Sequence, residues 1–350
     1  MVRSQSFIAT PPGATIKEQL NERGMSQKEF AARMNMSEKH ISKLINGEVQ
    51  LTQETAVRLE MVLGVPAKFW NNLEAIYREK IIKAEAENAM DADAEIAKQF
   101  PYSEMAKFGW VPNTRDAKEK VVNLRKYFEV VELSLLGSEQ ITRIACRRLA
   151  ITEKGDLALM AWAQEAKLKA RAVQTASINI KDLISVVPEI RNMTVLKPKE
   201  FCPRIKKCLA DCGIALVFLP HFKGSFLQGA SFIDGNKIVV GLTVRGKDAD
   251  KFWFSLFHEL AHIVLGHVGQ ANGTTEDDEK AADKWSSDTL ISFDDFEAFK
   301  EKKDYSQKSV LQFAKAQGIA PGIVVGRMQL EGMIKYSMLN NLKEKYEIAM

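Results

Sequence analysis

Apolar residues in the first part of the chain recur at helical spacing and are interrupted by turn residues, so residues 14–80 predict five short helices. Ser26, Ser37 and Thr52 stand where a side-chain oxygen can cap the second, third and fourth of these helices. About three residues around Asn35 separate the second helix from the third, which is the spacing of a helix-turn-helix. We expect a small shared core from Leu20, Phe30, Ala31, Met34, Ile41, Leu44, Leu59 and Leu63.

The next stretch, residues 76–99, is rich in Ala, Glu and Lys and lacks a strong apolar stripe. It is either a helical connector or, through apolar residues such as Ile82 and Met90, part of a dimer contact. Residues 116–190 again show helical spacing of apolar residues but carry no recognisable chemistry. Packing onto the C-terminal part, spacing the two ends and sensing a signal all stay open as roles for this region.

Strand-like segments are confined to one region of the chain. Residues 214–220, 229–234 and 237–244 are short and rich in β-branched residues, and turn residues separate them. They directly precede a very apolar helical stretch, so we expect a small, partly antiparallel sheet packed beside that helix. Residues 237–244 are the predicted edge strand, which an extended peptide could join by β-augmentation. A purely structural sheet is the alternative.

The stretch from Phe252 to His267 reads FWFSLFHELAHIVLGH and is apolar on nearly every side, as expected of a helix buried in a domain core. Residues four apart lie on one face of a helix, so His258 and His262 stand side by side. Two imidazoles placed in this way can hold one Zn²⁺, with Glu259 as a base beside the open position of the metal. The spacing therefore predicts a zinc site with His258 and His262 as ligands.

A catalytic zinc usually takes three protein ligands and one exchangeable water, so a third ligand is needed. His267 lies five residues after His262, which rotates it away from the metal face. Glu279 and Asp283 lie four residues apart in the next predicted helix, so Glu279 can be the third ligand while Asp283 orients a ligand histidine. The alternative is that Glu279 belongs to a solvated acidic cluster with residues 276–278.

These residue types together indicate hydrolysis of a peptide bond. A zinc ion held in this way lowers the pKa of a bound water toward about 7 and polarises a scissile carbonyl. Glu259 would take the proton during the attack and pass it to the leaving amine. Tyr336 and His221 are candidates for steadying the oxyanion.

Three blocks of the C-terminal part, FWFSLFHELAHIVLGH, EKAADKWSSDTLIS and AKAQGIAPGIVVGRMQLEG, follow one another in this order. Together they resemble the ImmA/IrrE family of metallopeptidases, and the likeness covers roughly residues 200–345. The resemblance implies a zincin-like peptidase domain, which the last block closes around the site. It also suggests a class of substrate, because the family includes peptidases that cleave helix-turn-helix repressors.

The segment SQKEFAARMNMSEKHISKLINGEVQLT, residues 26–52, resembles the Xre/HigA type of helix-turn-helix. A helix with lysine and asparagine on its polar face can enter the major groove, where lysine reaches guanine or phosphates and asparagine pairs with adenine. The candidate DNA contacts are Gln27, Lys39, His40, Ser42, Lys43 and Asn46. We interpret His40 as a solvated residue of the helix face and not as a metal ligand. A module that pairs with protein instead of DNA is the alternative.

The overall composition is that of a globular protein with room for two or three domains. The chain has 350 residues, of which 46% are hydrophobic, and its net charge of +4 does not by itself indicate nucleic acid. We identify no signal peptide and no apolar run of about 18 residues, and we expect a soluble, cytoplasmic protein without a membrane partner. The cysteines are too few for a disulfide scaffold. A second metal site at Cys202, Cys208 and Cys212 is conceivable, but reduced thiols in a helical core, with Cys146 among them, are the plainer interpretation.

We therefore predict a mainly α (α+β) chain in three parts. Residues 1–80 form a five-helix helix-turn-helix DNA-binding domain, residues 81–200 a helical middle region, and residues 201–350 a zincin-like metallopeptidase domain with a small β-sheet beside the HExxH helix. The leading hypothesis is a stress- or phage-related transcriptional regulator. It would bind double-stranded operator DNA as a homodimer and use Zn²⁺ to hydrolyse a peptide bond in itself or in a partner regulator.

Two other functions stay open. Because the first domain resembles HigA, the chain could be an antitoxin-like repressor whose zinc domain binds a toxin. In the other alternative, the zinc domain senses a ligand or a metal and hydrolyses little.

Overall fold

The chain folds mainly into helices with one small sheet, which confirms the predicted mainly α (α+β) class. The computed structural model describes residues 8–137, 153–222, 228–243, 248–270 and 274–347. It divides into two compact units, residues 1–95 (unit 1) and residues 96–350 (unit 2). Within the described residues, every helix is too short or too polar to span a bilayer.

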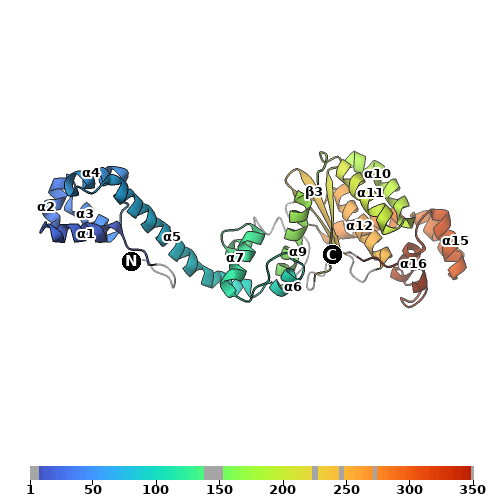
Figure 1. Cartoon of the computed structure of the whole chain (residues 1–350). Helices are drawn as coiled ribbons and strands as arrows, with labels where there is room; N and C mark the ends of the chain where they lie inside the picture. Colours follow the sequence, from blue (N-terminus) through green and yellow to red (C-terminus); the bar gives the residue numbers. More distant parts are fainter. Residues whose placement is uncertain (1–7, 138–152, 223–227, 244–247, 271–273, 348–350) are drawn as a thin grey trace. The chain divides into compact units, whose positions relative to one another are not determined.

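Unit 1 packs its helices around one small core (Figure 1). All eight residues that we predicted for this core are buried in it. Trp70 is fully buried and donates its ring N–H to the carbonyl of Val65, which fixes the start of the last helix on the core. The helices are α1 (Pro12–Glu22), α2 (Gln27–Met34), α3 (Glu38–Asn46), α4 (Gln53–Leu63) and α5 (Ala67–Ala97).

Unit 2 combines helices on both sides of a sheet with a helical C-terminal part. The boundaries predicted near residues 80 and 200 stay predictions, but α9 from the predicted middle region packs directly on the sheet. The helices before the sheet are α6 (Tyr102–Lys107), α7 (Ala117–Phe128), α9 (Glu153–Arg171), α10 (Ile180–Asn192) and α11 (Pro198–Asp211), with short 3-10 helices η1 (Leu133–Gly137) and η2 (Met193–Val195). The helices after it are α12 (Ala249–Val264), α13 (Glu276–Leu290), α14 (Phe293–Glu301), α15 (Gln307–Gln317) and α16 (Pro321–Leu330), followed by η3 (Asn340–Leu342).

The sheet has the strand order β1-β3-β2, with β1 (Ile214–Leu219), β2 (Gly229–Asp234) and β3 (Lys237–Thr243). β2 and β3 form an antiparallel hairpin, and β1 pairs with β3 in parallel. The prediction that residues 237–244 form the edge strand is therefore wrong, because β3 hydrogen-bonds on both sides. Among the described residues, the edges of this sheet are β1 and β2.

The two faces of β3 pack against different helices (Figure 1). Ile238, Val240 and Leu242 point into the main core, which they share with α12. On the other face, Gly241 lies against Trp162 of α9, and a Cβ at Gly241 would come within 2.6 Å of the Trp162 ring. Since side chains alternate along a strand, a residue without a side chain at position 241 lets α9 approach the sheet closely.

We expect Gly241→Ala to destabilise unit 2 by about 1–3 kcal/mol, because the added methyl group overpacks the contact between β3 and α9. Urea unfolding followed by circular dichroism measures this loss. Trp162→Phe removes part of the clashing ring, so the double variant should lose less stability than the sum of the two single variants. Additive losses would show that the contact at Trp162 does not cause the effect.

Candidate metal centre and DNA-binding helix

The HExxH helix α12 brings His258 and His262 together inside unit 2. Twelve of the 16 residues of α12, His262 among them, are buried, so the sheet and the neighbouring helices fix the orientation of this helix. The two Nε2 atoms lie 3.1 Å apart, and the ring of His262 is buried. The spacing of one helical turn seen in the sequence thus brings the Nε2 atoms of both imidazoles next to each other.

Glu279 of α13 contacts the Nε2 atoms of both histidines. Its carboxylate oxygens lie 3.4 Å from His258 Nε2 and 3.5 Å from His262 Nε2. The ligand atoms of these three residues all lie within 4.8 Å of one another, as predicted from the spacing. The structure therefore places Glu279 with the histidines and not in a separate solvated cluster.

A capping box sets the start of α13 and with it the position of Glu279. The Thr275 side chain accepts a hydrogen bond from the Asp278 N–H, and the Asp278 carboxylate accepts from the Thr275 N–H at 2.8 Å. These bonds hold the pKa of the Asp278 carboxyl below its usual value, so this group stays charged in the neutral pH range. Packing of Phe257 on Trp285, with ring centroids 6.5 Å apart, then joins α13 to α12.

The other ring nitrogen of each histidine also has a partner. His258 Nδ1 lies 2.7 Å from Asp283 Oδ1, where the sequence placed an orienting carboxylate. His262 Nδ1 lies 3.0 Å from His267 Nδ1, and His267 Nε2 lies 3.2 Å from Asp278 Oδ1. Partners of this kind fix the tautomer and the orientation of a ligand histidine.

His267 is the neighbour of this cluster that the sequence analysis did not predict. Helical spacing rotates it away from the metal face, but α12 ends at Val264 and the chain turns at Gly266, whose φ of 75° is left-handed. The His267 N–H then bonds to the His262 carbonyl at 2.8 Å, which returns the His267 ring to His262. The glycine directly before His267 is the signal that could have revealed this return.

Glu259, directly after His258 in α12, is buried. A Cβ at Gly229, the first residue of β2, would come within 2.9 Å of Glu259 Cγ and 3.0 Å of its Oε1. The glycine therefore leaves the space that the Glu259 side chain occupies.

The remaining candidate residues do not join this cluster. Tyr336 and His221 are exposed and do not belong to the three-residue cluster. Cys202, Cys208 and Cys212 are free thiols, and among the described residues they form no group of metal ligands. Cys146 lies outside the described residues.

The helix-turn-helix of unit 1 forms as its caps predict. Ser26 accepts a hydrogen bond from the Glu29 N–H, and Ser37 accepts one from the His40 N–H, both at 3.2 Å. Asn35 takes the left-handed conformation between α2 and α3, with φ of 51°. Arg58 of α4 donates to the carbonyls of Met34 and Asn35 and so fixes the turn.

The candidate DNA contacts occupy the outer face of α3 and the start of α2. Gln27, Lys39, Lys43 and Asn46 are exposed, whereas His40 and Ser42 are half-buried. On the opposite face of α3, Ile41, Leu44 and Ile45 are buried in the core, so the polar face points outward.

The charges of the outer face are distributed unevenly. Arg33 and Arg58 pair with Glu29 and Glu54 at 2.8 and 2.6 Å, which neutralises them. Within the described part of the chain, Lys39 and Lys43 take part in no ion pair. The positive charge of α3 is therefore available to a polyanion.

Comparison with known proteins concerns unit 1. Residues 16–70 match the model of the helix-turn-helix family. The chain is also 36% identical over 80 residues to the uncharacterized HTH-type transcriptional regulator YddM of Escherichia coli (strain K12). This match covers 23% of the chain and 81% of YddM. The chain therefore belongs, through its N-terminal unit, to the helix-turn-helix family of DNA-binding transcriptional regulators.

Proposed function

We propose that this regulator carries in unit 2 a zinc-dependent endopeptidase of the ImmA/IrrE type, which hydrolyses a peptide bond in itself or in a partner regulator. One observation carries the proposal. The candidate ligand atoms of His258, His262 and Glu279 lie within 4.8 Å of one another, and Glu259, the residue directly after His258 in α12, is buried. A fold in which these residues served only packing would not need this arrangement.

The donor set fits zinc. Two nitrogens bound at about 2.0–2.1 Å and at a tetrahedral angle lie roughly 3.3 Å apart. The two Nε2 atoms are separated by 3.1 Å, so small side-chain shifts satisfy this geometry. Two histidines and one carboxylate leave a fourth position for water or substrate, which is the composition of catalytic and not of structural zinc sites.

The protein's own groups supply the rest of the chemistry. When bound, zinc supplies a Lewis acid that polarises a scissile carbonyl and lowers the pKa of a water. Glu259 takes a proton at a carboxylate oxygen and delivers it to the leaving amine. Asp283 and the His267–Asp278 pair hold the outer nitrogens of His258 and His262, so both rings keep the same direction through the reaction.

The DNA-binding function uses α3 as the recognition helix in the major groove. Lys39, Ser42, Lys43 and Asn46 follow the spacing i, i+3, i+4 and i+7 and so share one face. We propose that two copies bind the half-sites of a palindromic operator, which is the usual geometry of helix-turn-helix regulators. Cleavage of the chain or of its partner would then change the occupancy of the operator.

We expect Glu259→Gln to retain zinc but to lower peptide cleavage by at least about 100-fold, since the change removes the base and leaves the three ligands. Zinc content is measured by metal analysis, and cleavage by incubation with the proteins encoded beside this gene. Glu276→Gln, at an exposed position of α13, is the matched control and should behave like the parent. Cleavage by Glu259→Gln at the parental rate would refute the mechanism, and absence of fragments from the parent would favour the antitoxin-like or sensor function.

His267→Ala should weaken zinc binding by about 10- to 100-fold, because His262 loses the partner of its outer nitrogen. Competition with a zinc chelator measures the affinity. Asp277→Ala is the control. It removes an exposed charge from the first turn of α13, where Asp277 pairs with Lys280. Equal affinities of His267→Ala and the parent would exclude the positioning role of His267.

Replacing Lys39 and Lys43 together with Ala should weaken binding to operator DNA and flatten its dependence on salt. Each lost phosphate contact lowers the slope of log K against log salt concentration by about 1. Fluorescence anisotropy on a duplex that the protein selects from genomic DNA provides the measurement. Lys17→Ala with Lys68→Ala removes the same charge from exposed positions of α1 and α5. If both pairs lower the affinity equally, net charge and not the face of α3 governs binding.

A further inference from the structure

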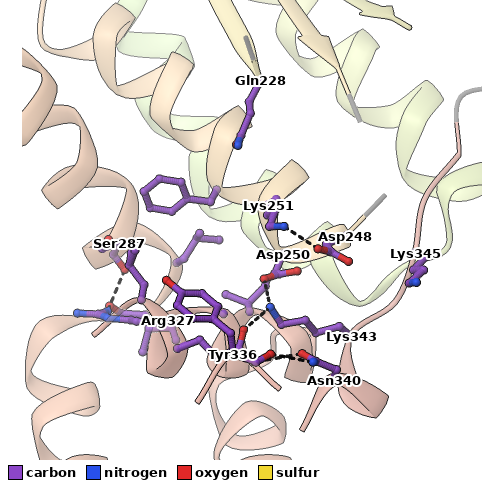
Figure 2. A pocket seen from close by; sticks show the side chains of 17 residues that line it. Gln228, Asp248, Asp250, Lys251, Ser287, Arg327, Tyr336, Asn340, Lys343 and Lys345 are labelled. Carbon is purple, nitrogen blue, oxygen red and sulfur yellow. Dashed lines mark hydrogen bonds and ion pairs between the residues drawn. The ribbon is translucent and has the colours of Figure 1, made fainter. Parts of the chain in front are cut away.

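A cavity of about 560 Å³ lies in unit 2 (Figure 2). Phe254 lines it one helical turn before His258, and the centroids of the two rings are 6.2 Å apart. Gln228 lines it directly before Gly229, the residue that packs against Glu259. The cavity therefore adjoins the candidate catalytic residues along α12, and its volume lies in the range of ordinary ligand pockets.

Apolar and charged side chains share the walls of the cavity, and among the described residues every charged side chain of the lining except Lys345 forms an ion pair. Lys251 pairs with Asp248 at 2.8 Å, and Lys343 pairs with Asp250 at 2.7 Å. A charged guest would have to be desolvated, and Lys345, the charge of the lining that stands outside these pairs, is exposed to solvent, so it compensates little of that cost. The apolar lining comes from Phe254, Leu290, Ile291, Ile323 and Leu330.

The C-terminal segment of the chain forms the outer wall. Buried Gln329 donates to the carbonyls of Tyr336 and Met338 at 3.3 and 2.9 Å and accepts from Lys343 Nζ at 2.8 Å. Figure 2 shows Tyr336 between the Arg327 guanidinium and the pair of Lys343 with Asp250. This buried polar network holds residues 336–343 against α12 and α16 and so fixes the shape of the cavity.

A glycine of α16 makes this network possible. A Cβ at Gly326 would come within 2.5 Å of Asp250 Oδ2, the atom that pairs with Lys343. The absence of a side chain at Gly326 thus allows α16 to approach Asp250 closely. This contact holds the C-terminal wall of the cavity in place.

We infer that this cavity is the subsite that receives a bulky, uncharged apolar side chain of the substrate next to the bond that is cut, with the C-terminal segment as its wall. The inference rests on the proposed peptidase function. It assigns the substrate class as a protein segment that offers leucine, methionine or phenylalanine at that position. Burial of such a side chain in the cavity strengthens binding through the hydrophobic effect, whereas lysine or glutamate gains nothing there.

The experiment measures binding and needs no known substrate. The zinc-loaded full chain is titrated calorimetrically with acetohydroxamate and with the hydroxamates of N-acetylated leucine, phenylalanine, lysine and glutamate. The hydroxamate group chelates the metal in every case, so differences among the probes report the side chain. We expect the leucine and phenylalanine probes to bind about 10- to 100-fold more tightly than acetohydroxamate, and the charged probes to bind no more tightly than acetohydroxamate.

A matched pair of variants locates the effect. Leu330 lines the cavity and is 64% exposed, whereas Met338 is 45% exposed and does not line it, so both positions tolerate a polar residue. Leu330→Asp should abolish the preference for leucine and phenylalanine and favour the lysine probe. Met338→Asp should keep the parental order of the probes.

The possible failures can be told apart. If acetohydroxamate does not bind the parent, the metal-site proposal is overturned and the subsite with it. If acetohydroxamate binds but the apolar probes show no preference, or if both variants behave alike, the metal site stands and the assignment of the cavity is wrong.

Discussion

The candidate metal centre depends on holding two imidazoles in one orientation one helical turn apart on a buried helix. The spacing in α12 brings Nε2 of His258 and Nε2 of His262 within 3.1 Å, but spacing alone does not fix the rotation of either ring. The neighbours of the outer ring nitrogens are Asp283, whose Oδ1 lies 2.7 Å from His258 Nδ1, and His267, whose Nδ1 lies 3.0 Å from His262 Nδ1, and these contacts restrict the rotation. Both partners belong to the segment that follows α12, so this segment determines the geometry of the site.

The capping box of α13 connects local folding with the chemistry of the site. Asp278 closes the first turn of α13 through Thr275 and at the same time contacts His267. The next residue, Glu279, faces the histidines, and Asp283 follows one turn later on the same side. A change in the start of α13 would therefore displace the third ligand candidate and both orienting groups together. On the other side of α12, Gly229 limits Glu259 in the same way, by close approach of the strand.

Structure that depends on residues close together in the chain was predictable from the sequence. The helices of unit 1, their serine caps and the pairing of His258 with His262 follow from helical periodicity, which is a property of neighbouring residues. Glu279 was predicted from its interval to Asp283 in the next helix, and its contact with the histidines depends on the packing of α13 against α12. The position of His267 was not predictable from periodicity, because it depends on the left-handed turn at Gly266 after α12 has ended. The central place of β3 was missed for a related reason. A hairpin is encoded locally, whereas the parallel pairing of β1 with β3 depends on the helices that cover both faces of the sheet.

The two units differ in which of their lysines form ion pairs, and this difference fits two different kinds of binding partner. In unit 1, arginines are neutralised by i, i+4 carboxylates, while the lysines of α3 remain exposed toward a partner that is itself strongly charged. Around the cavity of unit 2, Lys251 and Lys343 are paired with aspartates, and apolar side chains line the space between them. A surface that recognises phosphates gains from uncompensated charge because counterions are released on binding. A pocket that recognises an apolar side chain gains from compensated charge, because its affinity comes from the area removed from water. The α3 face and the cavity thus differ in physical character, and the variants proposed for each lie in different units of the chain.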